Sequence, residues 1–279
     1  MSDSGRKATI AEINTKYQLE PNLSKTIYVE GSSDKSFLEW FLKKCGIKNI
    51  AVFEINMVEI EAQQLFEKNL DDNHRDRIIL LSFLVNQGII GIIDSDFDFI
   101  KKPTYTKPPH LLLTDYSAME LYAFNKDTLE KILLGYPSKQ PESYQNFLDM
   151  LGSILVEIFL IRFAKKQIEP SLPHIDFNKD LSLKSKLVTF DRDSYLKKYV
   201  SSQQDKVEKF NSFIDERKKD IPDDIRKVIH GHDFINLLQF YLGIKQKDAK
   251  NVFEKSFYSS LDFNLLKKEG MFQKLIKML

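Results

Sequence analysis

Residues 91–98 read Gly91-Ile92-Ile93-Asp94-Ser95-Asp96-Phe97-Asp98. The run from Gly88 to Ile93 is apolar, which is typical of a buried strand, and aspartates follow it at every second position. If the strand continues, the three carboxylates share one face; if it turns at Ser95, they spread around one point. Three negative charges so close repel one another unless a cation lies between them. Hard oxygen ligands favour Mg²⁺ or Mn²⁺.

A second acidic residue follows another apolar run. Residues 26–29 precede Glu30 and Gly31, and a helical pattern with apolar positions at Phe37, Leu38, Phe41 and Leu42 comes next. In an open α/β sheet, ligands bind at the carboxyl ends of the strands. We therefore expect Glu30 and Asp94 to meet at one edge of a sheet.

The periodicities alternate in the first half of the chain. Strands are expected at 25–30, 49–55, 88–94 and 111–114, and helices at 33–44, 58–69 and 76–86. This order predicts an α/β fold with a mostly parallel sheet flanked by helices. Beyond residue 115 the patterns are helical, at 119–124, 126–134, 144–163, 205–219, 224–241 and 249–257, while 170–186 is expected to be irregular. We predict an N-terminal tail over 1–23, an α/β domain over 24–135 and an appended helical domain over 136–279.

Composition and charge bound the class of protein. The chain has 279 residues, 42% of them apolar and 29% charged, with a net charge of +1, as expected of a globular protein. The charge is uneven, because residues 151–279 carry 24 Lys and Arg against 18 Asp and Glu, whereas the first 150 carry 17 against 22. This split suits an acidic metal site beside a polyanion-binding surface, although solvated helices often show a similar surplus.

Several function classes are excluded. Cys45 is the single cysteine, so neither an intrachain disulfide nor a multi-cysteine zinc site is possible. No signal-peptide or membrane-length apolar run occurs, so we expect a cytoplasmic protein without a membrane partner. The sequence has no P-loop, no dinucleotide-binding glycine motif and no serine-hydrolase elbow.

The two acidic strand ends resemble the TOPRIM fold of topoisomerases, primases and related nucleases. Glu30 matches the family glutamate at the end of its first strand, and Asp94 and Asp96 match the Asp-x-Asp pair of a later strand. The resemblance covers about residues 24–125. It implies a Mg²⁺-dependent enzyme that breaks or forms phosphodiester bonds.

Two further stretches narrow the resemblance. Residues 112–120, Leu-Leu-Thr-Asp-Tyr-Ser-Ala-Met-Glu, and residues 231–234, Gly-His-Asp-Phe, are similar to those of a prokaryotic TOPRIM-like subfamily that includes the effector subunits of PARIS anti-phage systems. Membership implies a nuclease that acts on RNA such as tRNA and is held in check by an ABC-type ATPase partner. DNA as the substrate and a homodimer as the active form are left open. The chain departs from the subfamily at Ser32 and Ser33, where acidic residues are frequent.

Phosphodiester cleavage assigns roles to these carboxylates. A divalent ion can neutralise the phosphate, activate the nucleophile and assist the leaving oxygen. We expect Asp94 and Asp96 to position the metal, and Glu30 to be a ligand or the general base. Asp98 and Glu120 are additional candidate ligands. As alternatives, aspartates after a strand can cap a helix or form a turn; Asp34 and Asp115 are open to the same reading.

The helical half contains basic and histidine-rich stretches. Candidate nucleic-acid contacts share a positive charge and lie close in sequence: Arg162, Lys165, Lys166, Lys184 and Lys186. Tyr195 and Tyr199 are interleaved and could stack on bases, although a solvated helix face explains the lysines equally well. His230-Gly231-His232-Asp233 is either a metal or acid–base site or a packed kink.

Two other functions remain open from the sequence. One is a metal-dependent phosphohydrolase or nucleotidyltransferase that uses the same carboxylates. The other is a catalytically silent TOPRIM-like module that scaffolds an ATPase.

Overall fold

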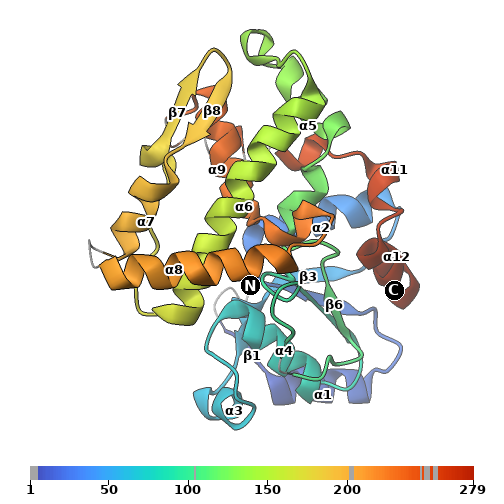
Figure 1. The fold of residues 1–279 in the computed structure, drawn as a ribbon. Helices are drawn as coiled ribbons and strands as arrows, with labels where there is room; N and C mark the ends of the chain where they lie inside the picture. The colour runs from blue at the N-terminus through green and yellow to red at the C-terminus, as the bar shows by residue number, and fades with distance from the viewer. Residues whose placement is uncertain (1–5, 104, 201–203, 246, 248–251, 254–256) are drawn as a thin grey trace. The chain divides into compact units, whose positions relative to one another are not determined.

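The computed structural model describes residues 6–103, 105–200, 204–245, 247, 252–253 and 257–279 (Figure 1). The chain forms two compact units. Unit 1 contains Met1–Asp94, Pro103–Asp115 and Phe263–Leu279, and unit 2 contains Ser95–Lys102 and Tyr116–Asp262. These units differ from the expected domains 1–23, 24–135 and 136–279, because the C-terminal segment belongs to the α/β unit and Ser95–Lys102 belongs to the helical one.

Unit 1 is built on a parallel sheet. Its four strands lie in the order β3 (Ala51–Glu54), β2 (Thr26–Val29), β5 (Ile89–Ile93) and β6 (Leu111–Leu113), and every neighbouring pair is parallel. All four expected strands are present, and the α/β prediction with a mostly parallel sheet is confirmed. A two-stranded parallel pair, β1 (Ala8–Thr9) and β4 (Val58–Glu59), was not expected.

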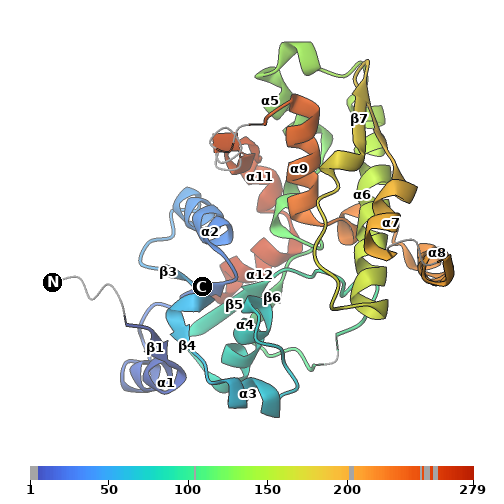
Figure 2. The same ribbon diagram turned by 90° about the vertical axis from the view of Figure 1, so that its left-hand side faces the viewer.

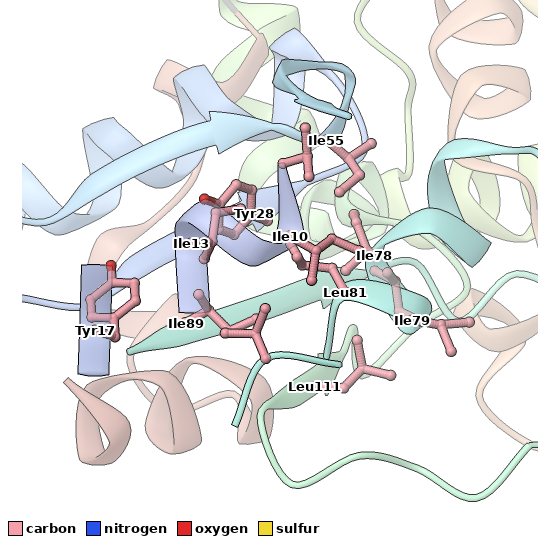
Figure 3. Close-up of a cluster of buried hydrophobic side chains, with 13 residues drawn as sticks. Ile10, Ile13, Tyr17, Tyr28, Ile55, Ile78, Ile79, Leu81, Ile89 and Leu111 are labelled. Atoms are coloured by element: carbon pink, nitrogen blue, oxygen red, sulfur yellow. The ribbon is translucent and has the colours of Figure 1, made fainter. Parts of the chain in front are cut away.

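Helices cover both faces of this sheet. Two of them, α2 (Ser32–Lys44) and α12 (Gly270–Met278), lie on one side of it, while α1 (Ile10–Leu19) and α4 (His74–Leu84) lie on the other (Figure 2). Because side chains alternate along a strand, Tyr28, Ile89 and Leu111 point to the second side and join the core there (Figure 3). The sheet is therefore buried on both faces, which explains its continuous apolar runs.

The N-terminal segment is part of the core. Thr9 and Glu12 form a capping box at the start of α1, and Ile10, Ile13 and Tyr17 are buried against the sheet. The expectation of a tail over residues 1–23 is therefore wrong for the described part of that segment. The apolar spacing of Ile10, Ile13 and Tyr17 is a helical signal that polar neighbours obscured.

Two glycines let the elements of unit 1 approach closely. Gly91 of β5 faces α4, where an added Cβ would lie 2.5 Å from Ser82 Oγ and 2.7 Å from Ile78 Cγ2. Gly88 precedes β5 with φ +80°, and an added Cβ would lie 2.1 Å from the Tyr17 ring. Helix α4 can therefore pack closely on β5 at Gly91, and helix α1 can pack closely on the chain just before β5 at Gly88, because neither residue has a side chain.

The C-terminal residues complete the α2 side of the sheet. Phe272 of α12 lies 4.5 Å from Phe41 and 5.8 Å from Phe37, measured between ring centroids. Phe263, in the short helix α11 (Phe263–Leu266), also contacts Phe41. The last segment of the chain thus supplies part of the core that the first hundred residues begin.

Unit 2 is organised around the long helix α6 (Tyr144–Ile168). Packed on it are α5 (Lys126–Leu134), α7 (Arg192–Val200), α8 (Gln204–Arg217) and α9 (Gly231–Leu242). The expected helices at 126–134, 144–163 and 205–219 are confirmed. The expected helix at 119–124 is a 3₁₀ turn, Met119–Ala123, and that at 224–241 is a 3₁₀ turn followed by α9. The expected helix at 249–257 falls mostly outside the described residues.

Two stretches differ from the sequence-based expectation. The helix expected over 58–69 is shorter, because β4 and an extended link precede α3 (Ala62–Glu67). The stretch 170–186, expected to be irregular, contains β7 (Leu181–Lys184), which pairs antiparallel with β8 (Leu187–Phe190). Ser185 and Lys186 join them with φ +47° and +67°, the turn geometry that tight hairpins require. Ser-Lys is not a usual sequence for that turn, which is why the hairpin was missed.

No helix in the described ranges is long and apolar enough to cross a membrane.

Gly88 gives a test of this packing. We expect Gly88→Ala to lower the free energy of unfolding by about 3 kcal/mol, because it adds left-handed backbone strain and an overlap with the Tyr17 ring. Gly46 is a matched control, since its φ is +71° and nothing lies within 4 Å of an added Cβ. Gly46→Ala should cost about 1 kcal/mol from strain alone. Urea unfolding measures both, and equal losses would contradict the packing.

Candidate functional site

The carboxyl ends of β2 and β5 bring two predicted site residues together. Glu30 follows β2, Asp94 follows β5, and the two strands are hydrogen-bonded neighbours. The backbone N–H of Asp94 donates to Glu30 Oε1 at 3.0 Å. Both side chains are half-buried. The predicted convergence of Glu30 and Asp94 is therefore confirmed within unit 1.

The residues after Glu30 shape the start of α2. Gly31 is the N-cap, and its N–H donates to the Asp34 carboxylate at 3.2 Å. Asp34 therefore caps the helix, in agreement with the alternative raised from the sequence. This cap fixes the direction in which the chain leaves the strand beside Glu30.

Arg75 brings a positive charge to the same edge. It lies in the first turn of α4, and its Nε donates to the backbone oxygen of Asp94 at 3.2 Å. Its Nη2 lies 3.5 Å from the hydroxyl of Tyr105. Sequence reasoning missed this residue, because nothing in the spacing of a lone arginine at a helix start points to a distant strand end.

Asp96 and Asp98 lie in unit 2, beyond a turn. The strand ends at Ile93, and Asp96 has φ +43°, so the alternative in which the chain turns is confirmed. The N–H of Asp96 donates to the Ser117 carbonyl at 2.8 Å, and the N–H of Asp98 donates to the Ser95 carbonyl at 2.8 Å. That Asp96 and Asp98 join Glu30 in one metal site remains a prediction.

Asp115 caps a helix other than the one expected. The N–H of Met271, near the start of α12, donates to both Asp115 oxygens at 2.9 and 3.1 Å. An added Cβ on Gly270 would lie 2.8 Å from Asp115 Oδ1. A carboxylate at this place satisfies orphan N–H groups and suits the positive end of the helix, so Asp115 anchors the returning C-terminal segment of unit 1.

Glu120 is buried in unit 2. Its residue is 4% exposed, and its Oε1 lies 3.6 Å from His232 Nδ1. The backbone of Gly231 lies against the same carboxylate, since an added Cβ would come within 2.1 Å of Glu120 Oε2. His232 itself is largely exposed. The two predicted motifs, at residues 112–120 and 231–234, therefore contact each other, a contact that the sequence did not predict.

Arg162 and Asp233 form a buried ion pair. Arg162 Nη1 lies 2.6 Å from Asp233 Oδ2, and Nη2 lies 3.1 Å from His174 Nε2. Burial raises the pKa of Asp233 to about 6, although the Arg162 charge opposes this shift. The prediction that Arg162 grips a backbone phosphate is wrong, because its guanidinium is buried and serves this pair.

His230 lies beside that ion pair. Its Nδ1 is buried and has no hydrogen-bond partner among the described residues. Burial lowers the pKa of His230 to about 3, and the neighbouring Arg162 charge lowers it further. The ring is therefore neutral at physiological pH, so unit 2 contains Arg162 with its carboxylate partner and an uncharged imidazole next to it.

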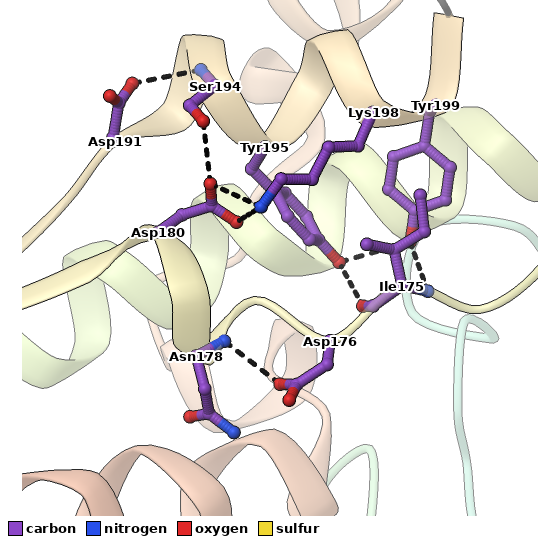
Figure 4. A network of polar contacts seen from close by, with 9 residues as sticks. All are labelled: Ile175, Asp176, Asn178, Asp180, Asp191, Ser194, Tyr195, Lys198 and Tyr199. Carbon is purple, nitrogen blue, oxygen red and sulfur yellow. Dashed lines mark hydrogen bonds and ion pairs between the residues drawn. The ribbon is translucent and has the colours of Figure 1, made fainter.

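The predicted base-stacking tyrosines are also buried. Tyr195 and Tyr199 share a hydrogen bond of 3.1 Å between their hydroxyls, and Tyr195 donates to the Ile175 carbonyl (Figure 4). Asp180 accepts hydrogen bonds from Ser194 and Lys198 in the same network and borders a cavity of about 430 Å³. Tyr195 and Tyr199 therefore hold α7 in place, and the prediction that they stack on bases is wrong.

The four predicted lysines differ in exposure. Lys165 is half-buried, while Lys166, Lys184 and Lys186 are exposed. Lys186 Nζ donates to the Gln140 carbonyl at 2.7 Å. All four are accessible to solvent to some degree, and their contact with nucleic acid remains a prediction.

Glu30 and Asp94 offer the oxygen donors that Mg²⁺ prefers. Among the described residues no three His, Cys, Asp or Glu side chains are grouped as a metal site. Mg²⁺, however, keeps several waters and needs only one or two direct carboxylates. A carboxylate has about four acceptor positions, and the Asp94 amide occupies one of those of Glu30.

No family model matches this chain, and a comparison with curated proteins finds no match.

The pH dependence of stability tests the buried histidine. His230 stays neutral in the folded state down to about pH 3, whereas in the unfolded chain it gains a proton below about 6.5. Its contribution is therefore lost as the pH falls from 6.5 towards 3. Asp233 acts oppositely, because its raised pKa favours folding as the pH falls from about 6 to about 3.8.

His230 makes the free energy of unfolding fall as the solution becomes acidic. We expect the His230→Gln variant to lack this decrease, so that between pH 6.5 and 4 its free energy of unfolding falls less than that of the wild type. The difference in slope is up to about 1.4 kcal/mol per pH unit. Chemical unfolding at several pH values measures it, with the exposed His74→Gln as control. Parallel curves for His230→Gln and the wild type would contradict the burial of this ring.

Gly231 tests the contact between the two motifs. Gly231→Ala should displace the Glu120 carboxylate and lower the free energy of unfolding by about 1–3 kcal/mol. It should also shift the His232 ring resonances in an NMR spectrum. Gly135→Ala is the control, because the nearest atom to its added Cβ lies 3.6 Å away. If Gly231→Ala leaves both the stability and the His232 signals unchanged, Glu120 does not lie where we describe it.

Proposed function

We propose that this protein is a Mg²⁺-dependent nuclease of the TOPRIM type. The observation that supports it most is the hydrogen bond from the Asp94 amide to Glu30 at the ends of adjacent parallel strands. Two carboxylates at one sheet edge, each after a buried strand, form an arrangement suited to a divalent ion and a phosphodiester.

Glu30 and Asp94 are the residues that would hold the ion. When bound there, Mg²⁺ supplies neutralisation of the phosphate charge and a lowered pKa for a coordinated water. Arg75 offers a second positive group next to Asp94, since its guanidinium contacts the Asp94 backbone. Arginine binds phosphate oxygens well, so we assign Arg75 to the scissile phosphate or its neighbour. Asp96 and Asp98 are proposed as further metal-positioning groups.

The resemblance of the motifs supports the biological part of the proposal. It points to a prokaryotic anti-phage effector that cleaves RNA such as tRNA, is controlled by an ABC-type ATPase and is dimeric when active. A cytoplasmic location belongs to the same proposal. The contact of residues 112–120 with 231–234 agrees with a shared role for these motifs but does not distinguish a nuclease from a scaffold.

Cleavage assays test the proposal. Purified protein with Mg²⁺ should cleave pooled tRNA or DNA, and both Glu30→Gln and Asp94→Asn should reduce the rate at least 100-fold. Glu39→Gln is the matched control, because this exposed glutamate lies on α2 in the same unit. EDTA should stop the reaction and added Mg²⁺ or Mn²⁺ should restore it.

Other outcomes point to the other functions. Turnover of mononucleotides without cleavage of nucleic acid would indicate a phosphohydrolase. A protein that is inert with every substrate, alone and with its ATPase partner, would contradict the enzyme proposal and favour the scaffold. Circular dichroism of each variant shows whether a loss of activity reflects a loss of fold.

A further inference from the structure

The segment Ser95–Lys102 is fixed to the C-terminal part of α6 within unit 2. The Phe97 ring centroid lies 4.8 Å from that of Phe159 and 5.2 Å from that of Phe163. Lys101 Nζ lies 3.3 Å from Gln167 Oε1. The positions of the side chains that this segment carries are therefore set by the same helix.

Lysines from two other elements lie over the two phenylalanines of this segment, which itself carries a third lysine, Lys101. Lys166 Nζ of α6 lies 5.2 Å from the Phe97 ring centroid. Lys227 Nζ, in the 3₁₀ turn Ile225–Val228, lies 5.4 Å from the Phe99 ring centroid. Lys101 completes the group. We call Lys101, Lys166, Lys227 and Phe99 the lysine–phenylalanine surface.

Among the described residues, the lysines of this surface are not paired with acids, although Asp96 and Asp98 belong to the same segment and Lys227 acts electrostatically on Asp224. Within the described ranges none of the three ammonium groups forms an ion pair. The nearby acids have other partners, since Asp224 binds Arg226 at 2.7 Å and Glu169 binds Lys206 at 3.0 Å. Three ammonium groups without an ion-pair partner attract a polyanion.

Phe99 adds an aromatic face to the positive charge. It is 37% exposed, among the few large apolar side chains of unit 2 that are exposed. A cation beside an exposed ring stabilises a protein by only about 0.5–1 kcal/mol. The contact with Lys227 therefore offsets little of the cost of exposing the Phe99 ring to water. Aromatic rings among lysines are the usual means of holding unpaired bases along a charged backbone.

We propose that the lysine–phenylalanine surface binds single-stranded nucleic acid, with the lysines on phosphates and Phe99 stacked on a base. This inference rests on the proposed nuclease function and names the form of its substrate. Phe99 follows Asp94 by five residues, so the chain keeps the two within about 18 Å.

A binding assay in the Glu30→Gln background tests the surface without cleavage. The probes are a fluorescent 12-nucleotide single-stranded RNA and the same RNA as a duplex, followed by anisotropy between 50 and 200 mM salt. Lys101→Ala, Lys166→Ala and Lys227→Ala together should weaken single-strand binding at least tenfold. The slope of log affinity against log salt should fall in magnitude by about two.

The control removes the same charge from elsewhere in unit 2. Lys126, Lys209 and Lys219 are exposed, and their triple alanine variant should bind like the parent. Phe99→Ala should weaken binding of the single strand about fivefold or more and leave duplex binding unchanged. Phe99→Trp should show a change in fluorescence when the single strand binds.

Three results would overturn the inference: equal losses in the two triple variants, equal effects of Phe99→Ala on single strand and duplex, or binding of polyglutamate as tight as that of RNA. The inference and the proposed function fail separately. Cleavage by wild-type protein with no effect of the surface variants would remove only the surface. Specific single-strand binding without any cleavage would remove only the nuclease.

Discussion

The parallel pairing of β2 with β5 is the constraint on which the candidate site depends. All four residues of β2 and all five of β5 are buried, and α4 approaches β5 at Gly91, where an added Cβ would overlap Ser82 and Ile78. A shift of β5 by one residue would place an isoleucine side chain at that point, which the packing does not allow. The register places Tyr28 opposite Gly91. It therefore also determines which residues emerge at the carboxyl edge, and these are Glu30 and Asp94. The packing of the core thus determines that Glu30 and Asp94 lie next to each other, although neither residue is part of the core.

Unit 2 uses buried charge in a different way. Arg162, Asp233 and the neutral His230 lie where two helices meet, and burying an ion pair costs desolvation energy that its attraction only partly offsets. Such a pair is weak evidence for stability. It does, however, orient the start of α9, the same turn that carries Gly231 and His232 against Glu120. Ionisable groups gathered in this way are more typical of functional regions than of plain helical packing.

The sequence was informative where short-range rules decide the structure. Apolar runs that end in an acidic residue or a glycine predict the strands. Because parallel strands have their carboxyl ends at one edge of the sheet, the proximity of Glu30 and Asp94 could be predicted. Arg162 could not be assigned correctly from charge alone. A signal was nevertheless present, since an arginine in the most apolar stretch of the chain requires a buried partner. Asp233, which is followed by the apolar residues Phe234 and Ile235, was a suitable candidate.

Contacts between segments far apart in the sequence could not be predicted from the periodicity of apolar residues. The C-terminal helix α12 has the same amphipathic pattern as the helices before it, and nothing local indicates that Phe272 packs on Phe41 or that Asp115 caps its first turn. The same limit applies to Arg75, whose partner is a backbone oxygen at the end of a distant strand. Contacts with backbone atoms leave no residue-type signal in the partner segment, so a sequence pattern cannot identify them.

The turn after Asp94 is held by contacts within unit 2. Asp96 occupies the left-handed region, which costs a residue with a Cβ about 1 kcal/mol or more, and aspartate is among the residues that tolerate it best. Its N–H is held by the Ser117 carbonyl, so a strained residue is maintained by unit 2 directly beyond the last strand residue of unit 1. Backbone strain of this kind persists where its surroundings determine it, and it clusters at functional sites. A straight continuation of β5 would have placed Asp94, Asp96 and Asp98 on one face at no such cost. The chain instead turns there, which places Phe97 against α6, and the lysine–phenylalanine surface follows from that packing.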